Sequence, residues 1–164
     1  MNLKGDETTL TFSGSDVTIA NDNGCLEKEY ATVTISCSGN YYLMGTASNF
    51  QVIVNTEDSD IGKVDLFLNK VSLKSDDAPI YVQRAEKTEL HLVKGTSNSI
   101  EDGSSRTKTY SYMTSKGEKV ESTNAAIYAK DDLSIKGSGA LTVKANFNNG
   151  IQSSNDLRFR GETI

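Results

Sequence analysis

A step of 24 residues superimposes one part of this chain on another, and it limits the fold more than any other feature. Residues 148–161 align with residues 124–137, matching Ile on Ile, Asp on Asp, Leu on Leu and Gly on Gly. A unit this short cannot bury its own apolar face, so the copies must stack on one another. The repeat therefore predicts an architecture of stacked units.

The same step recurs earlier in the chain. Residues 64–68 lie 24 positions before residues 88–92, and apolar positions alternate with other residues in both segments. Residues 80–82 match residues 127–129 when the polar stretch at 101–123 is counted as an insertion. We therefore predict that 101–123 loops out of one repeat.

The rest of the sequence consists of short strand-like runs bounded by Gly, Asn, Asp and Ser, and no window has a helical apolar period. About three short strands per 24-residue copy favour an all-β, right-handed parallel β-helix, a solenoid whose coils stack at ~4.8 Å. A β-sandwich or Greek-key domain also has many short strands, but it needs no residue identity at a fixed step. We predict one β-helix domain over residues 1–164.

Composition and charge limit the partners. The net charge of −5 argues against nucleic acid, because phosphate binding needs a basic face. No apolar run is long enough to span a membrane. The final residues, 157–164, open a new strand without a cap. We expect the natural chain to continue, or another molecule to cover this end, which includes end-to-end self-association.

The two cysteines and the single histidine have few predicted roles. Cys25 and Cys37 flank one strand region and are candidates for a disulfide, or they remain two buried or partly buried thiols. His91 lies between Leu90 and Leu92 on the outward side of an alternating strand. We expect it to be an ordinary surface residue.

Acidic and amide side chains recur at the corners between strands, where stacking brings them within reach of a common ion. One predicted cluster contains Asp131, Asp132, Asn155 and Asp156, and a second column contains Asp77, Asn124 and Asn148. Calcium takes six to eight oxygen ligands of these kinds, so both sets are candidate calcium ligands. The alternative is that they are turn formers that bind only backbone.

Aromatic residues give a second candidate site. Tyr81 and Tyr128 each follow an inward isoleucine at equivalent positions, so we expect both rings outside, where they can stack on sugar faces. Tyr110 and Tyr112 of the insertion would form a lip beside them. The alternative is that these tyrosines are simply good strand residues. Lys130 is a further candidate for carbohydrate binding and the best candidate base of a lyase, although a solvated lysine is the simpler reading.

The segment from Ala126 to Val143, with its Asp-Asp-Leu motif, and the Gly150-Ile151 pair resemble a family of bacterial carbohydrate-binding domains. The family occurs in secreted or surface-attached proteins of plant-fibre-degrading bacteria. The resemblance implies a parallel β-helix similar to polysaccharide lyases, bound calcium, and binding to cellulose-like or pectin-like polysaccharide. Its motif covers Asp131, Asp132, Asn155 and Asp156. This chain departs from the family pattern because it has the insertion and because Glu86-Lys87 stand where the later copies have the acid pair.

Three functions are compatible with these features. The first is a non-catalytic module that binds plant cell-wall polysaccharide and holds structural calcium. The second is a calcium-dependent polysaccharide lyase, and the third is a structural or adhesive solenoid that binds protein. We favour the first, in a secreted or cell-surface bacterial protein.

Overall fold

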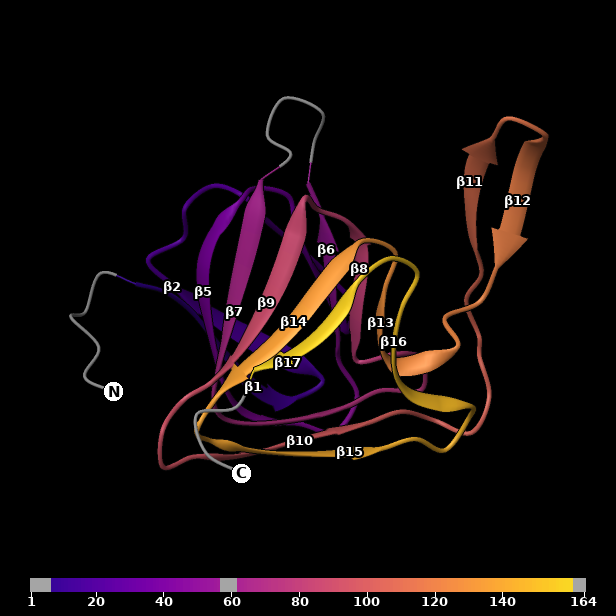
Figure 1. Cartoon of the computed structure of the whole chain (residues 1–164). Coiled ribbons are helices and arrows are strands. Elements are labelled where there is room, and N and C mark those ends of the chain that lie inside the picture. Colours follow the sequence, from indigo (N-terminus) through magenta and orange to yellow (C-terminus); the bar gives the residue numbers. More distant parts are fainter. Residues whose placement is uncertain (1–6, 57–61, 161–164) are drawn as a thin grey trace.

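The computed structural model describes residues 7–56 and 62–160, and the regular elements within these ranges are all β-strands (Figure 1). Two sheets share one apolar core, and a separate two-stranded hairpin stands away from them (Figure 1). No helix in the described part of the chain is long and apolar enough to cross a bilayer.

The larger sheet has nine strands, in the order β17-β14-β9-β7-β5-β1-β2, with β10 pairing with both β7 and β15. Its pairs are parallel except for β1 with β2 at the edge, which is antiparallel. The strands are β1 (Thr8–Gly14), β2 (Asp16–Ala20), β5 (Gly39–Ala47), β7 (Lys63–Lys74), β9 (Lys87–Leu92), β10 (Ser97–Glu101), β14 (Asp132–Gly137), β15 (Ala140–Lys144) and β17 (Leu157–Arg160).

The smaller sheet has six strands, in the order β16-β13-β8-β6-β4-β3. It is parallel except for the antiparallel edge pair of β3 and β4. Its strands are β3 (Leu26–Glu29), β4 (Thr32–Ile35), β6 (Gln51–Asn55), β8 (Ile80–Arg84), β13 (Ala125–Ala129) and β16 (Asn149–Ser153). The separate hairpin consists of β11 (Tyr110–Thr114) and β12 (Gly117–Glu121).

The prediction of a right-handed parallel β-helix built from 24-residue coils is wrong, although the all-β class is right. The described strands form mixed sheets with antiparallel edges, and no closed solenoid occurs among them. The fixed step also fails between several neighbours: Thr8 pairs with Tyr41, and Val52 pairs with Ile80. Loops of unequal length absorb these differences, because pairing requires only that the apolar face stays in the core.

The repeat does predict the register of individual strand pairs. Leu133 pairs with Leu157 and Ile127 with Ile151, both at the 24-residue step. The alignment across the insertion is also confirmed, because residues 80–82 pair with residues 127–129. The sequence therefore predicted neighbouring strands correctly where the repeat is strict.

Strict alternation along the strands divides the core from the surface. In β7, Val64, Leu66 and Leu68 are fully buried, whereas Asp65 and Phe67 lie on the other face. Inward side chains of both sheets join one apolar cluster, so the sheets face each other across it. Since successive strand residues point to opposite faces, each buried row fixes an outward row beside it.

The predicted insertion, residues 101–123, contains the hairpin and is anchored at its base by a buried ion pair. The Arg106 Nη2 lies 2.8 Å from Asp102 Oδ2, and the Arg106 Nε donates to the carbonyl oxygen of Thr123. The guanidinium also lies over the ring of Phe147, 4.4 Å from its centroid. Asp102 additionally accepts a hydrogen bond from the Asn146 amide. These contacts tie the insertion to the corner that follows β15.

The two ends of the hairpin formed by β3 and β4 are joined by a disulfide between Cys25 and Cys37. Strand β17 forms an edge of the larger sheet, and its Leu157 and Phe159 are exposed. End-to-end self-association through that edge stays a prediction.

The anchor of the insertion gives a first test. Arg106→Met should lower the free energy of unfolding by about 3–5 kcal/mol, because it leaves the Asp102 carboxylate buried without its partner. Urea unfolding measures this difference. The matched control is Lys144→Met, because Lys144 is 67% exposed and lies 3.9 Å from Glu101. Its effect should stay within about 1 kcal/mol. Equal effects of the two substitutions would contradict the anchoring role.

Candidate functional site

The outward side chains of β7, β9, β14 and β17 form a polar surface, which we call the charged face. The parallel register places them in three columns that run across the strands. The first column is Lys63, Lys87, Asp132 and Asp156; the second is Asp65, Glu89, Ser134 and Arg158; the third is Phe67, His91, Lys136 and Arg160. Neighbours lie ~4.8 Å apart across strands and about 7 Å apart along them.

Glu89 lies at the centre of the charged face, and only 5% of its side chain is exposed. Its carboxylate lies 2.8 Å from the Nζ of Lys136, 2.9 Å from that of Lys63 and 3.3 Å from that of Lys87. Burial by itself raises the pKa of Glu89, but hydrogen bonds from Lys136, Lys63 and Lys87 outweigh burial and lower the pKa to about 2. The Glu89 side chain is therefore a fixed negative charge that forms ion pairs with three lysines.

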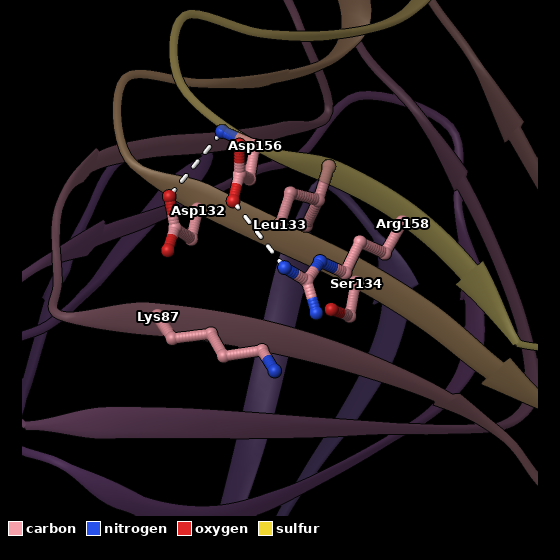
Figure 2. Close-up of a pocket in the computed structure, with 6 residues that line it drawn as sticks. All are labelled: Lys87, Asp132, Leu133, Ser134, Asp156 and Arg158. Atoms are coloured by element: carbon pink, nitrogen blue, oxygen red, sulfur yellow. Dashed lines mark hydrogen bonds and ion pairs between the residues drawn. The ribbon is translucent and has the colours of Figure 1, made fainter.

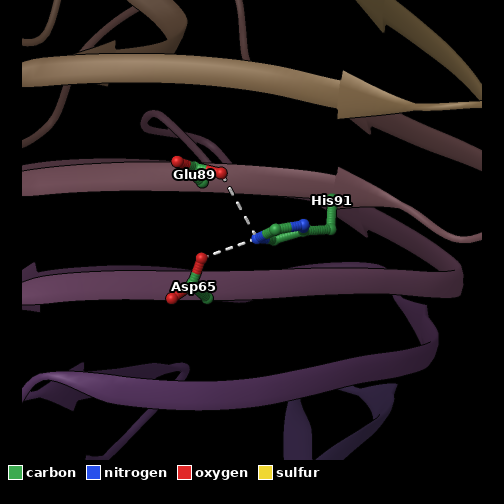
Figure 3. A group of neighbouring side chains, drawn as sticks. All are labelled: Asp65, Glu89 and His91. Carbon is green, nitrogen blue, oxygen red and sulfur yellow. Dashed lines mark hydrogen bonds and ion pairs between the residues drawn. The ribbon is translucent and has the colours of Figure 1, made fainter. Parts of the chain in front are cut away.

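His91 and Asp65 extend this cluster along the sheet (Figure 3). The His91 Nε2 lies 2.6 Å from Asp65 Oδ1 and 3.6 Å from Glu89 Oε2, and the ring points between the two carboxylates. Its other contact is aromatic: the rings of His91 and Phe67 are stacked at 4.2 Å, and Phe67 stacks on Tyr42 at 4.5 Å. His91 faces outward as expected, but it is part of a built cluster and not an ordinary surface residue.

Asp65, Glu89 and His91 also have the residue types of a metal site, and their ligand atoms lie within 4.8 Å of one another. Three lysines surround the same carboxylate, however, and they compensate its charge directly. We therefore interpret this group as the ionic centre of the charged face.

A shallow pocket of about 140 Å³ opens next to this centre (Figure 2). Lys87, Asp132, Ser134, Asp156 and Arg158 line it, together with Leu133. The Asp132 carboxylate accepts a hydrogen bond from the backbone amide of Asp156 at 3.3 Å, and Asp156 lies 3.6 Å from the Arg158 guanidinium. Two carboxylates and two cations thus meet at one pocket.

The structure brings only part of the predicted calcium cluster together. Asp132 and Asp156 share the pocket, but the Asp131 carboxylate accepts a hydrogen bond from the backbone amide of Ala85. Asn155 donates its side-chain amide to Asp132 Oδ1. Three of the four predicted ligands, Asp132, Asn155 and Asp156, therefore meet at this corner, whereas Asp131 points toward Ala85. Their oxygens are of the kinds that calcium prefers.

The second predicted column serves other roles. Asp77 is buried, and its carboxylate accepts hydrogen bonds from the backbone amides of Thr107 and Lys108 and from the Thr107 hydroxyl. It thereby fixes the insertion. The Asn124 carbonyl accepts the backbone amide of Asn149, and Asn148 is exposed. Neither Asn124 nor Asn148 lines the hollow that Asp77 borders.

The expected tyrosine ladder exists, but its exposure was predicted wrongly. Tyr81 and Tyr128 are paired neighbours with ring centroids 5.8 Å apart, yet each is only 2% exposed. Tyr110 of the insertion packs on Tyr81 at 4.3 Å, and its hydroxyl oxygen accepts a hydrogen bond from Gln51. The insertion covers the ladder because Tyr110 docks on it. These rings therefore present no face to a sugar in this structure.

Lys130 has a partner within the protein as well. Its Nζ lies 2.5 Å from Glu121 Oε1, and the same oxygen accepts a hydrogen bond from the Tyr128 hydroxyl at 2.9 Å. Lys130 therefore belongs to the contact between the hairpin and the smaller sheet. The side chain of Tyr112, the last residue of the predicted sugar site, lies outside the described part of the chain.

Sequence reasoning missed the residues at the centre of the charged face. Lys63 and Lys87, and likewise Asp65 and Glu89, are related by the 24-residue step. Reading the outward positions of the two segments column by column would have found them. In this arrangement the charged face can form hydrogen bonds with sugar hydroxyls and bind carboxylates through its cations.

Comparisons with known proteins place this chain among carbohydrate-binding domains. Residues 29–164 match the family described as carbohydrate-binding domain-containing protein. A protein of that description from Acetivibrio thermocellus is 37% identical over 159 residues, which cover 94% of this chain and 51% of that protein. The gadolinium derivative of a polysaccharide lyase-like protein from C. thermocellum has a TM-score of 0.78 at 33% identity, covering 93% of this chain and 58% of that one. The chain thus spans about half the length of the curated relative.

The low pKa of Glu89 predicts a specific dependence of stability on pH. Because its folded pKa lies below the ordinary 4.5, the carboxylate stabilises the fold fully above about pH 5 and loses this effect as the pH falls toward about 2. Glu89→Gln should therefore cost about 3 kcal/mol at pH 7 and progressively less in acid.

The free energies of unfolding of the wild-type protein and of Glu89→Gln, compared between pH 7 and pH 3, measure this difference in stability. Glu101→Gln is the control, because Glu101 is 29% exposed and lies 3.8 and 3.9 Å from its lysines. Its difference should stay within about 1 kcal/mol at every pH. A constant difference for Glu89→Gln would show that its carboxylate does not titrate as assigned.

Proposed function

We propose that this chain, which belongs to the family of carbohydrate-binding domain-containing proteins, binds polysaccharide through the charged face of its larger sheet. The observation that carries the proposal is the ordered array of outward side chains on four parallel strands. Such an array matches an extended polymer, because its chemical groups recur at short, regular distances along and across the strands.

The charge of this face favours an acidic polysaccharide. The chain as a whole carries a net charge of −5, but the charged face combines five cationic side chains with four carboxylates. Glu89 holds three of these cations in place, so less conformational entropy is lost when they bind an anion. We therefore favour a pectin-type polysaccharide of the plant cell wall over a cellulose-type one as the ligand of this face.

We also propose that calcium takes part through Asp132 and Asp156. Calcium prefers carboxylate and hydroxyl oxygens, and it would neutralise these two groups beside a bound uronic acid. Lys87 and Arg158 line the same pocket and would contact the sugar carboxylate directly. Sugar oxygens and water would supply the remaining ligands.

Binding without cleavage fits the state of the lysines. A lyase needs an uncharged base, but the hydrogen bond from Lys63 to Glu89 raises the pKa of Lys63. Lys87 and Lys136 pair with the same carboxylate. We accordingly propose a non-catalytic module in a secreted or cell-surface protein, a location that the Cys25–Cys37 disulfide supports.

Retention on immobilised polygalacturonate and on cellulose tests this function. The wild-type chain should be retained on polygalacturonate, and the double variant Lys87→Ala with Arg158→Ala should lose about tenfold or more in affinity, as expected when two charge-assisted contacts are removed. The control removes two cations from the hairpin region, Lys116→Ala with Lys119→Ala, and changes the net charge equally.

Retention with and without a chelator tests the ion separately. Calcium removal should weaken binding to polygalacturonate and leave any binding to cellulose unchanged. No retention of the wild-type chain on either polymer would exclude the proposed function. An equal loss in both double variants would show that only overall charge matters.

A further inference from the structure

Tyr30 is the most exposed large side chain with apolar surface in the described chain, at 86%. It occupies the two-residue turn between β3 and β4, followed by Ala31 with φ 55. A positive φ at the second position of such a turn favours glycine or asparagine, so the left-handed Ala31 is strained, whereas the first position accepts most residues. The turn itself therefore does not require a tyrosine at position 30.

Tyr30 lines two hollows of the surface. One, of about 500 Å³, is formed with Ser15 and Asp16 at the start of β2 and with Lys28 and Glu29 of β3. The other, of about 160 Å³, is lined by polar residues from the corners before β6 and after β7 and from the insertion, including Asn49, Ser75, Asp76, Thr107 and Lys108.

An exposed tyrosine that lines two polar hollows is suited to a sugar. A hexose ring has an apolar face that packs on an aromatic ring and equatorial hydroxyls that reach outward. Here carboxylates of Glu29 and Asp76 can accept hydrogen bonds from those hydroxyls, and the Asn49 amide can donate and accept.

The charge around Tyr30 selects against a uronic acid. The two hollows contain four carboxylates, from Asp16, Glu29, Asp76 and Asp77, and two lysines. Both lysines already have partners. Lys28 pairs with Asp16, and the Lys108 Nζ donates to Gln51 Oε1 at 3.1 Å. An acidic sugar would meet net negative charge here, whereas a neutral sugar would find hydrogen-bond acceptors.

Tyr30 is also separate from the charged face. It belongs to the edge hairpin of the smaller sheet, whereas the charged face lies on the outer surface of the larger sheet. Both sheets pack their inner faces into the same core, which lies between the two surfaces.

We infer that Tyr30 is the platform of a second subsite, which binds a neutral hexose unit of a polysaccharide. The inference rests on the proposed function of the chain and divides it between two surfaces. The charged face takes acidic sugars, and the Tyr30 subsite takes uncharged ones.

Calorimetric titration of the full chain with cellohexaose, a neutral probe, and with an oligogalacturonate in calcium tests this division. Tyr30→Ala should weaken cellohexaose binding by about tenfold, because the stacking surface is lost, and leave oligogalacturonate binding within about twofold. Tyr30→Phe keeps the ring and should restore most of the affinity for cellohexaose. Thermal melting should be the same for all three proteins, since the side chain is exposed.

The outcomes separate this inference from the proposed function. Unchanged cellohexaose affinity in Tyr30→Ala, or no cellohexaose binding by the wild-type chain, would overturn the Tyr30 subsite. Oligogalacturonate binding that depends on Lys87 and Arg158 would still support the proposed function of the charged face, whatever the result for Tyr30→Ala. Loss of both ligands in Tyr30→Ala with unchanged melting would contradict the separation into two surfaces.

Discussion

The register of the parallel strands is the constraint on which the rest of this structure depends. Side chains alternate between two faces, so a slip of one residue would turn Val64, Leu66 and Leu68 of β7 out of the core. Burial of these residues and of their neighbours on β9 and β14 therefore fixes the pairing. The same pairing places Lys63 beside Lys87 and Asp65 beside Glu89. The charged face is thus a direct consequence of how the core packs.

Stacking side chains of like charge ~4.8 Å apart causes electrostatic repulsion, and local ion pairs on the charged face offset this repulsion. Glu89 pairs with three lysines, one of which, Lys63, also pairs with Asp65, and His91 lies between Glu89 and Asp65. The same ionic centre keeps several cations at the surface of a chain whose net charge is negative. A surface that holds its charges in fixed positions is suited to a repeating ligand, because the charges need little rearrangement on binding.

The sequence predicts contacts between neighbouring strands well and the whole architecture poorly. The repeat predicted the pair Leu133 with Leu157 at the 24-residue step and, across the insertion, the pair Tyr81 with Tyr128, because identical residues in stacked strands occupy identical environments. It did not reveal the antiparallel edges or the unequal steps, since those depend on turns and loops outside the repeat.

The exposure of Tyr81 and Tyr128 was mispredicted for a related reason. Tyr110 reaches them from an insertion whose docking through Asp77 and Arg106 has no periodic signal. Of the predicted calcium ligands, Asp132 and Asp156 share a pocket, whereas Asp131 turns toward Ala85 because a corner residue can point either way.

The central claim is that polysaccharide binds the outer surface of the larger sheet. Backbone amide chemical shifts of the isotope-labelled chain, recorded by NMR during titration with an oligogalacturonate in the presence of calcium, test it most directly. The account predicts that the largest shifts occur in β9, β14 and β17, around Lys87, Ser134 and Arg158, and that the core strands β6 and β8 change little. Shifts confined to the hairpin β11–β12, or no shifts at saturating ligand, would contradict it.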